Sequence, residues 1–180
     1  PQCRNALAQP LSSENFDHAG HAFAEHGIGV GSLTIDVAKM LARKQAVVKQ
    51  NNDGILYLFK KNKVAFFHGR GSFAGRGDGG TWQVAVAGAK PETLTARHVI
   101  VATGSNARPL PGAPFDEQTI LSNDGALAID AVPKTLGLVG AGVIGLEMGS
   151  VWRRLGADVT ILEALPDFLE GLKSGVELQT

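Results

Sequence analysis

The residues with the clearest chemical meaning in this sequence form a glycine-rich run, Gly140-Ala141-Gly142-Val143-Ile144-Gly145. The spacing GxGxxG suits a turn that joins a strand to a helix. In such a turn the first glycine permits the tight bend, the second lets the backbone approach a pyrophosphate, and the third allows the helix to pack closely on the strand. The N-terminus of the helix attracts the phosphate charge. The run therefore predicts a dinucleotide-binding turn.

An acidic residue, Glu163, follows this turn by about twenty residues, the offset at which a carboxylate binds the ribose hydroxyls of a dinucleotide. A carboxylate there would repel a 2′-phosphate, and no arginine follows it in the stretch ALPDF. We therefore expect NAD as the ligand in preference to NADP. The alternative is a glycine-rich packing turn followed by a surface glutamate.

The elements around the turn favour the nucleotide-binding interpretation. Residues 135–139 predict a strand before the turn, residues 142–155 a helix after it, and residues 157–164 a second strand. Strand, helix and strand together make the βαβ unit that a dinucleotide fingerprint requires.

Two helices are expected nearer the N-terminus. The first runs from Ser13 to Glu25, with Ser12 or Ser13 as its cap and Gly27 as its left-handed stop. The second runs over residues 36–61, with an interruption at Gly54. Its apolar stripe consists of Val37, Met40, Leu41, Val47 and Val48.

The middle of the chain is rich in strand-forming residues. Three runs, at 64–73, 82–88 and 94–104, alternate with glycine-rich turns and predict a small antiparallel meander. The last run ends in HVIVATG, which we expect to be a buried strand. Residues 105–119 contain many prolines and turn formers, so they read as a crossover or linker. The predicted fold class is α/β.

Composition excludes several classes of function. The 17 basic residues balance the 17 acidic ones, so no net field favours nucleic acid. No apolar run is long enough to span a membrane, and no signal segment precedes the first helix. The single cysteine excludes an internal disulfide framework, and the five histidines show no metal-ligand spacing. We expect a cytoplasmic protein without a metal.

Several segments in order resemble one known family. The stretch GAGVIGLEMGSVWRRLGADVTILEALP is similar to the NAD-binding start of the pyridine nucleotide–disulfide oxidoreductases, in particular of their dihydrolipoamide dehydrogenase branch. The segments LFKKNKVAFFHGRGSF, HVIVATGSNARPLPG and ILSNDGALAI resemble that family's FAD-domain segments in the same order. The resemblance covers about residues 12–168, and several motifs in order are more specific than any one alone.

The resemblance implies two Rossmann-like domains, FAD-binding and then NAD-binding, followed by a dimerisation domain. Residues 1–119 would be an incomplete FAD-binding domain and residues 120–180 the start of the NAD-binding domain. It also implies roles for individual residues. The backbone of Thr103, Gly104 and Ser105 would pass close to FAD, and the backbone near Gly71 would meet its adenine.

A further role implied by the resemblance falls on Glu147, which we expect on the first turn of the nucleotide-binding helix. In the family this glutamate pairs with a lysine beside the flavin, where hydride passes between the cofactors. The alternative is that Glu147 only complements the helix dipole.

The family reaction passes electrons from dihydrolipoamide, carried on 2-oxoacid dehydrogenase complexes, through an enzyme disulfide and FAD to NAD, in a homodimer. This chain has neither the family's first GxGxxG nor its CxxxxC pair, and its final residues, EGLKSGVELQT, lack the expected helix-then-strand pattern. Cys3 falls where the second redox cysteine would lie, but Leu7 stands where the flavin-side lysine would be, so we expect Cys3 to be coincidental. We therefore expect a central piece of a longer, truncated or frame-disrupted reading frame, inactive alone and with no catalytic residues of its own.

Two other functions remain open at the level of sequence. One is a different member of the superfamily, such as a mercuric or glutathione reductase or a soluble transhydrogenase, although Glu163 argues against the members that prefer NADP. The other is a nucleotide-binding or interaction module without catalysis.

Overall fold

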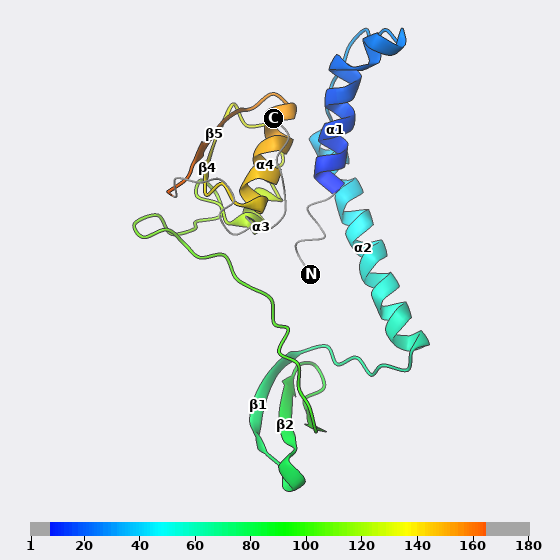
Figure 1. The fold of residues 1–180 in the computed structure, drawn as a ribbon, viewed down its shortest axis with the longest axis vertical. Coiled ribbons are helices and arrows are strands. Elements are labelled where there is room, and N and C mark those ends of the chain that lie inside the picture. Colours follow the sequence, from blue (N-terminus) through cyan, green and yellow to red (C-terminus); the bar gives the residue numbers. More distant parts are fainter. Residues whose placement is uncertain (1–7, 165–180) are drawn as a thin grey trace, which may run out of the picture. The chain divides into compact units, whose positions relative to one another are not determined.

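A computed structural model describes residues 8–164 of the chain (Figure 1). Within this range the backbone forms two compact units, one made of residues 50–106 and one made of residues 8–49 together with 107–164. Cys3 and the predicted irregular tail at 170–180 lie outside the described residues. The expected domain division at residue 119 stays a prediction.

The first unit begins with helix α1, Ala8–His21, which is followed by a short 3-10 helix, Phe23–His26. Gly27 ends this helical region in the left-handed conformation, with φ 75°, as predicted. The predicted cap at Ser12 or Ser13 is wrong. Both serines lie inside α1, which begins at Ala8, so neither occupies the N-cap position. Ser13 Oγ instead donates to the carbonyl of Pro10, and Ser12 Oγ to that of Ala8.

Helix α2, Val37–Lys61, begins where the sequence indicates. Asp36 caps it, because its carboxylate accepts the backbone N–H of Lys39 at 2.9 Å. The predicted interruption at Gly54 is wrong, since the helix continues through it. One glycine lowers helix propensity by about 1 kcal/mol, which is too little to break a helix of 25 residues.

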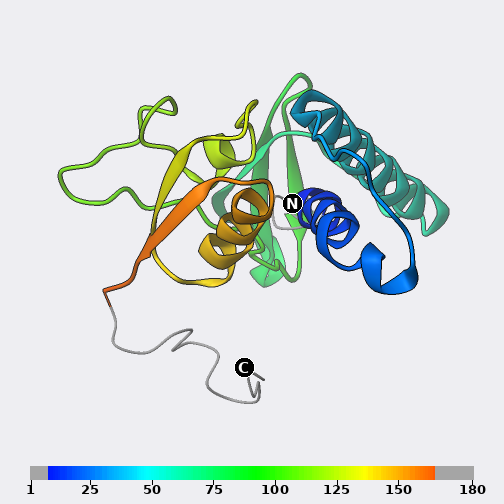
Figure 2. The same ribbon diagram turned by 90° about the horizontal axis from the view of Figure 1, so that it is seen from above.

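The predicted βαβ unit is confirmed. Strand β4, Thr135–Val139, pairs in parallel with β5, Asp158–Leu162, and helix α4, Val143–Arg154, connects them. Figure 2 shows α4 lying against the two strands, as their contacts require. Gly156, with φ 103°, reverses the chain after α4 and lets Ala157 donate to the carbonyl of Trp152. The short helix α3, Asn123–Ala126, comes before this unit.

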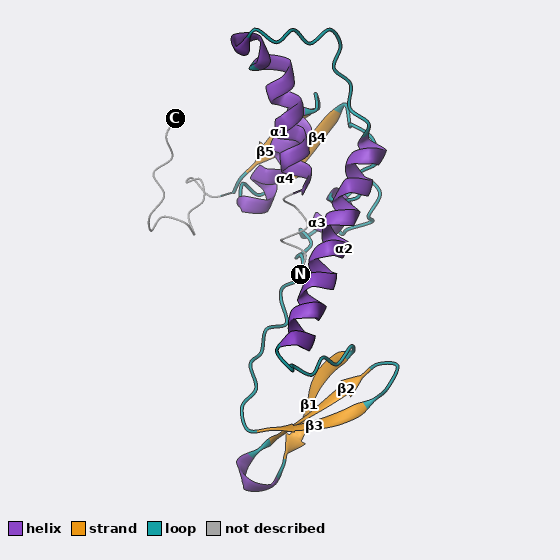
Figure 3. Ribbon diagram, turned by 90° about the vertical axis from the view of Figure 1, so that its right-hand side faces the viewer, coloured by secondary structure: helices purple, strands orange, loops and turns teal. Residues whose placement is uncertain are grey.

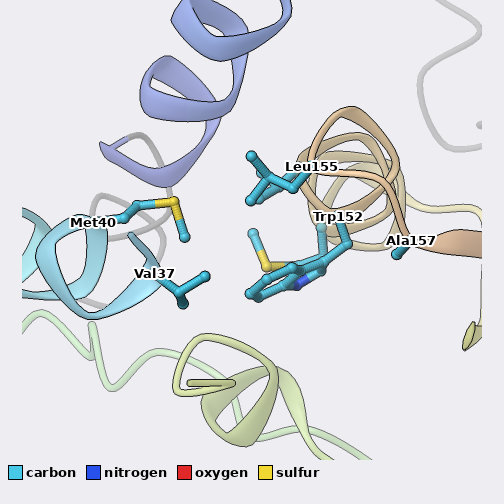
Figure 4. Close-up of a cluster of buried hydrophobic side chains, with 7 residues drawn as sticks. Val37, Met40, Trp152, Leu155 and Ala157 are labelled. Carbon is cyan, nitrogen blue, oxygen red and sulfur yellow. The ribbon is translucent and has the colours of Figure 1, made fainter. Parts of the chain in front are cut away.

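The core of the first unit lies where α4 meets α1 and α2. Val37 and Met40 of α2 point toward Trp152 and Leu155 of α4 (Figure 4). Trp152 is 1% exposed, and Phe16 of α1 packs at the edge of the same cluster. Of the predicted apolar stripe of α2, Val37, Met40 and Leu41 are therefore confirmed as part of this core. Val47 and Val48 are half-buried and are not among the described core residues.

A lysine lies on the same face of α2 as Val37 and Met40. Lys44 is only 5% exposed, and its ammonium donates to the carbonyl of Leu127, which also accepts from Gln9 at 3.4 Å. Burial lowers the pKa of Lys44 below its ordinary value, because desolvation disfavours the charged form. The carbonyl of Leu127 thus links α1, α2 and the segment that follows α3.

The second unit contains the predicted antiparallel meander. Strands β1 (Arg70–Arg76), β2 (Trp82–Ala87) and β3 (Glu92–Ala96) pair in the order β1-β2-β3 (Figure 3). A bulge between Phe73 and Gly75 shifts the register of β1. Near it the guanidinium of Arg76 lies 3.4 Å from the ring centre of Trp82, and Phe73 packs on the same ring.

The predicted buried strand HVIVATG is wrong. Residues 97–105 form no strand, and Ile100 is 91% exposed. A strand needs a neighbour with which to share backbone hydrogen bonds, and within residues 8–164 no segment bonds to this one. No helix in that same range is long and apolar enough to cross a membrane.

Lys44 predicts a measurable effect of pH on stability. Between its lowered pKa and the ordinary value of 10.5, the unfolded chain holds a proton that the folded chain does not. The free energy of unfolding should therefore rise with pH in this window. In a Lys44→Met variant that rise should be smaller, as measured by urea unfolding monitored by tryptophan fluorescence at several pH values.

The matched control for this experiment is Lys134→Met, because Lys134 is an exposed lysine in the same unit. This control should keep the pH dependence of the unmodified chain. An identical pH slope in the unmodified chain and in Lys44→Met would contradict the assignment.

Candidate functional site

The three glycines of the turn have three different environments. Gly140 has φ 103°, a conformation that other residues rarely adopt. A Cβ on Gly145 would collide with the carbonyl oxygen of Gly140, so the helix can lie this close to the turn only without a side chain there. A Cβ on Gly142 would meet no atom within 4 Å. The chain itself therefore requires glycine at 140 and 145, whereas the space beside Gly142 is open to a ligand.

Helix α4 also lies close to the two strands at Gly149, which the sequence motif did not predict. A Cβ there would lie 2.9 Å from a methyl of Leu138 on β4 and 3.4 Å from one of Ile161 on β5. The signal that would have found it is the spacing of one helical turn between Gly145 and Gly149, which puts both glycines on the face toward the sheet.

The carboxylate of Glu163 lies at the turn. Its Oε2 accepts the backbone N–H of Ala141 at 2.7 Å, and its Oε1 accepts the N–H of Ala164 at 2.8 Å. The structure thus brings the two sequence-predicted features, the glycine-rich turn and the acidic residue after β5, into direct contact.

Helix α4 starts without a side-chain cap. Gly142 occupies the N-cap position, and the first intrahelical bond runs from Leu146 to the carbonyl of Gly142. The preceding N–H groups of the first turn have no intrahelical acceptor, which leaves them available to an anion.

The predicted place of Glu147 on the first turn is wrong. The helix begins at Val143, and its first turn holds no acidic residue, so Glu147 is half-buried on the second turn. Complementing the helix dipole therefore explains its presence less well than the sequence indicated, because the dipole effect is confined to the end turns.

A groove of about 1140 Å³ opens beside the turn, entirely within the first unit. One part of its lining comes from residues 107–111, 113, 115, 119–123 and 126, and the other from residues 137–140, 142–145 and 148. Much of the lining is apolar, including Leu110, Phe115, Ile120 and Ile144. Of the predicted residues, Gly140, Gly142, Val143, Ile144 and Gly145 line the groove, whereas Ala141, Glu147 and Glu163 are not among its described lining residues.

The remaining predicted residues belong to the second unit. Gly71 lies in β1, opposite Val86 of β2. Thr103, Gly104 and Ser105 lie in the exposed segment after β3, with Gly104 at φ 76°. Their proposed contacts with FAD stay predictions. Within residues 8–164 no three side chains of His, Cys, Asp or Glu gather in a way that could hold a metal ion.

The match to known proteins covers nearly the whole chain, including the turn and the groove. Residues 5–179 match the family described as pyridine nucleotide-disulphide oxidoreductase. The chain belongs to this family. It is 53% identical, over 97% of its length, to a dihydrolipoyl dehydrogenase of Cupriavidus necator, and 43% identical, over 98%, to dihydrolipoyl dehydrogenase 1, mitochondrial, of Arabidopsis thaliana.

A solved structure of the family has a similar backbone. The crystal structure of LpdA from Mycobacterium tuberculosis matches with a TM-score of 0.78 and 25% identity over 93% of the chain. The chain spans only about a third of each relative, 36% of the Cupriavidus protein, 34% of the Arabidopsis protein and 36% of LpdA. It is thus a homologue of dihydrolipoyl dehydrogenases along one part of their length, with a mixed α/β fold that includes a three-stranded antiparallel sheet.

The glycine environments predict different outcomes for two similar substitutions. Gly145→Ala should lower the free energy of unfolding by about 1–3 kcal/mol, because the new methyl group forces α4 away from the turn. Gly142→Ala should lower it by less than about 1 kcal/mol, since the methyl group enters open space. Urea unfolding of the two variants beside the unmodified chain measures both, and equal losses of stability would contradict this account.

Proposed function

We propose that the βαβ unit carries part of an NAD site. In this proposal the pyrophosphate lies at the N-terminus of α4, against the turn from Gly140 to Gly145, and the carboxylate of Glu163 hydrogen-bonds the ribose of the adenosine half. Membership of a family named for pyridine nucleotides supports the proposal. The FAD contacts would come from the backbone of Thr103, Gly104 and Ser105 and from the strand near Gly71, with Glu147 near the meeting point of the two cofactors.

The observation that carries the proposal is the contact between Glu163 and Ala141. The 2.7 Å hydrogen bond holds the carboxylate at the turn before any ligand is present. A carboxylate oxygen has a second lone pair and can accept a ribose hydroxyl as well. The same charge would repel a 2′-phosphate, so the geometry supports NAD in preference to NADP.

For the whole protein we propose dihydrolipoamide oxidation. Electrons would pass from dihydrolipoamide, presented by 2-oxoacid dehydrogenase complexes, through a disulfide and FAD to NAD, and two copies of the whole protein would form the active dimer. The supporting observation is the identity of 53% to a dihydrolipoyl dehydrogenase across nearly the whole chain. NAD supplies the nicotinamide that accepts the hydride; the residues of this chain would bind and orient it. Residues 1–119 would form the FAD-binding part and residues 120–180 the NAD-binding part.

Titration with reduced dinucleotides tests the NAD site. We expect the chain to bind NADH more tightly than NADPH, as measured by the change in nicotinamide fluorescence. In Glu163→Gln the preference should shrink about fivefold, because one charge repulsion near a surface is worth on the order of 1 kcal/mol.

Glu14→Gln is the matched control, since Glu14 is an exposed glutamate on α1. It should leave the preference unchanged. Equal affinity of the unmodified chain for NADH and NADPH would sink the proposed role of Glu163.

A second prediction concerns turnover. A chain with one cysteine cannot form the internal redox disulfide that the proposed reaction uses. With FAD, NAD and dihydrolipoamide supplied, the 180-residue chain should form NADH no faster than a blank without protein. NADH formation that scales with protein concentration would contradict this prediction, because it would mean that the chain oxidises dihydrolipoamide without an internal disulfide.

A further inference from the structure

A tight loop after the proline-rich segment is closed by one carboxylate. Oδ1 of Asp116 accepts the backbone N–H groups of Gln118, Thr119 and Ile120 at 2.8, 2.7 and 2.8 Å. The carbonyl of Ile120 in turn accepts the N–H groups of Asp116 and Glu117. The hydrogen bonds that the carboxylate accepts, first among them the one from Gln118, lower the pKa of Asp116, so the carboxylate is ionised at neutral pH.

The hydrogen bonds continue from this loop into α3. Glu117 holds a left-handed conformation, with φ 55°, and its Oε2 accepts the N–H of Ser122 at 3.4 Å. The hydroxyl of Ser122 then caps α3 by accepting the N–H of Asp124 at 3.2 Å. Gly125 leaves room for the carboxylate of Glu117, because a Cβ there would collide with Oε2. The chain from Asp116 to Gly125 is thus fixed by its own polar groups.

The segment that Asp116 fixes lines the groove beside the glycine-rich turn. Thr119, Ile120 and Leu121 contribute to the lining, together with Gly142 and Ile144 from the start of α4. Glu163 instead contacts the turn through Ala141, and none of the described lining residues comes from β5. A dinucleotide with its adenosine ribose at Glu163 and its pyrophosphate at α4 would extend its other half into this groove.

We propose that Asp116 is a positioning residue for the nicotinamide half of the bound dinucleotide. It acts through the backbone of Thr119 and Ile120, which it holds as a wall of the groove, and it does not touch the ligand itself. The largely apolar lining suits a flat heteroaromatic ring on a ribose. The inference rests on the proposed NAD site, and it adds a residue that the nucleotide fingerprint does not contain.

Two ligands separate this role from a general loss of structure. NADH fills both halves of the site, whereas ADP-ribose lacks the nicotinamide ring. In the full chain, Asp116→Ala should weaken NADH binding by about tenfold while ADP-ribose binding stays within about twofold. Asp116→Asn should fall between Asp116→Ala and the unmodified chain, because its amide oxygen still accepts hydrogen bonds. Fluorescence titration measures NADH binding and calorimetry measures ADP-ribose binding.

Asp130→Ala is the matched control, because it removes the same charge as Asp116→Ala. Asp130 is exposed in the same unit and is not among the groove residues. It should bind both ligands as the unmodified chain does. If Asp116→Ala does not fold, as judged by circular dichroism, the comparison is made with Asp116→Asn.

Each outcome decides a different question. A preserved ratio of NADH to ADP-ribose affinity in the Asp116 variants overturns the positioning role while leaving the proposed NAD site intact. Equal affinity of the unmodified chain for the two ligands overturns the assignment of the groove to the nicotinamide half. Failure of the folded, unmodified chain to bind either ligand overturns the proposed NAD site and this inference with it.

Discussion

Helix α4 lies closer to its turn and its strands than a helix with a side chain at every position would allow, and the first unit depends on this close packing. Gly145 rests on the carbonyl of Gly140, and Gly149 rests on Leu138 and Ile161. Because the helix axis is fixed on that side, Trp152 and Leu155 reach the core that α2 completes. The same packing places the start of α4, residues 142–145, in the lining of the groove. Packing and the binding geometry thus follow from two small residues on one face.

The connection between Glu163 and Ala141 adds an electrostatic link to this packing. It joins the residue after β5 to the turn after β4, where the ladder already continues from Gly140 to the carbonyl of Leu162. The turn is therefore held from both sides before a ligand arrives, which reduces the conformational entropy that binding would cost. One N–H group of the turn is occupied by the glutamate, so a bound anion would depend on the N–H groups at the start of α4.

Local signals predicted the parts of the structure that are governed by local interactions. The βαβ unit, the first part of the apolar stripe of α2 and the left-handed stop at Gly27 follow from local periodicity and glycine chemistry. The errors have more than one cause. Gly54 is tolerated because the flanking turns support the helix, and HVIVATG is not a strand because pairing depends on a partner that the run itself cannot specify. The loop closed by Asp116 was not predicted, because a single aspartate among turn formers resembles any solvated loop residue. The burial of Lys44 was equally hidden, since its helical position is apparent from the sequence but the carbonyl that receives it is not.

The segment after β3 has a consequence for the behaviour of the chain in solution. Its Val-Ile-Val run presents apolar side chains, with Val101 67% exposed, along a backbone whose donors and acceptors bond to no other described segment. Such a stretch can form the hydrogen-bond ladder of a sheet with the same stretch of another molecule, and each added copy presents a fresh edge to the next. We therefore expect the fraction of self-associated chain to rise steeply with concentration. A charged residue in place of Ile100 should reduce this association, because like charges on stacked copies repel one another.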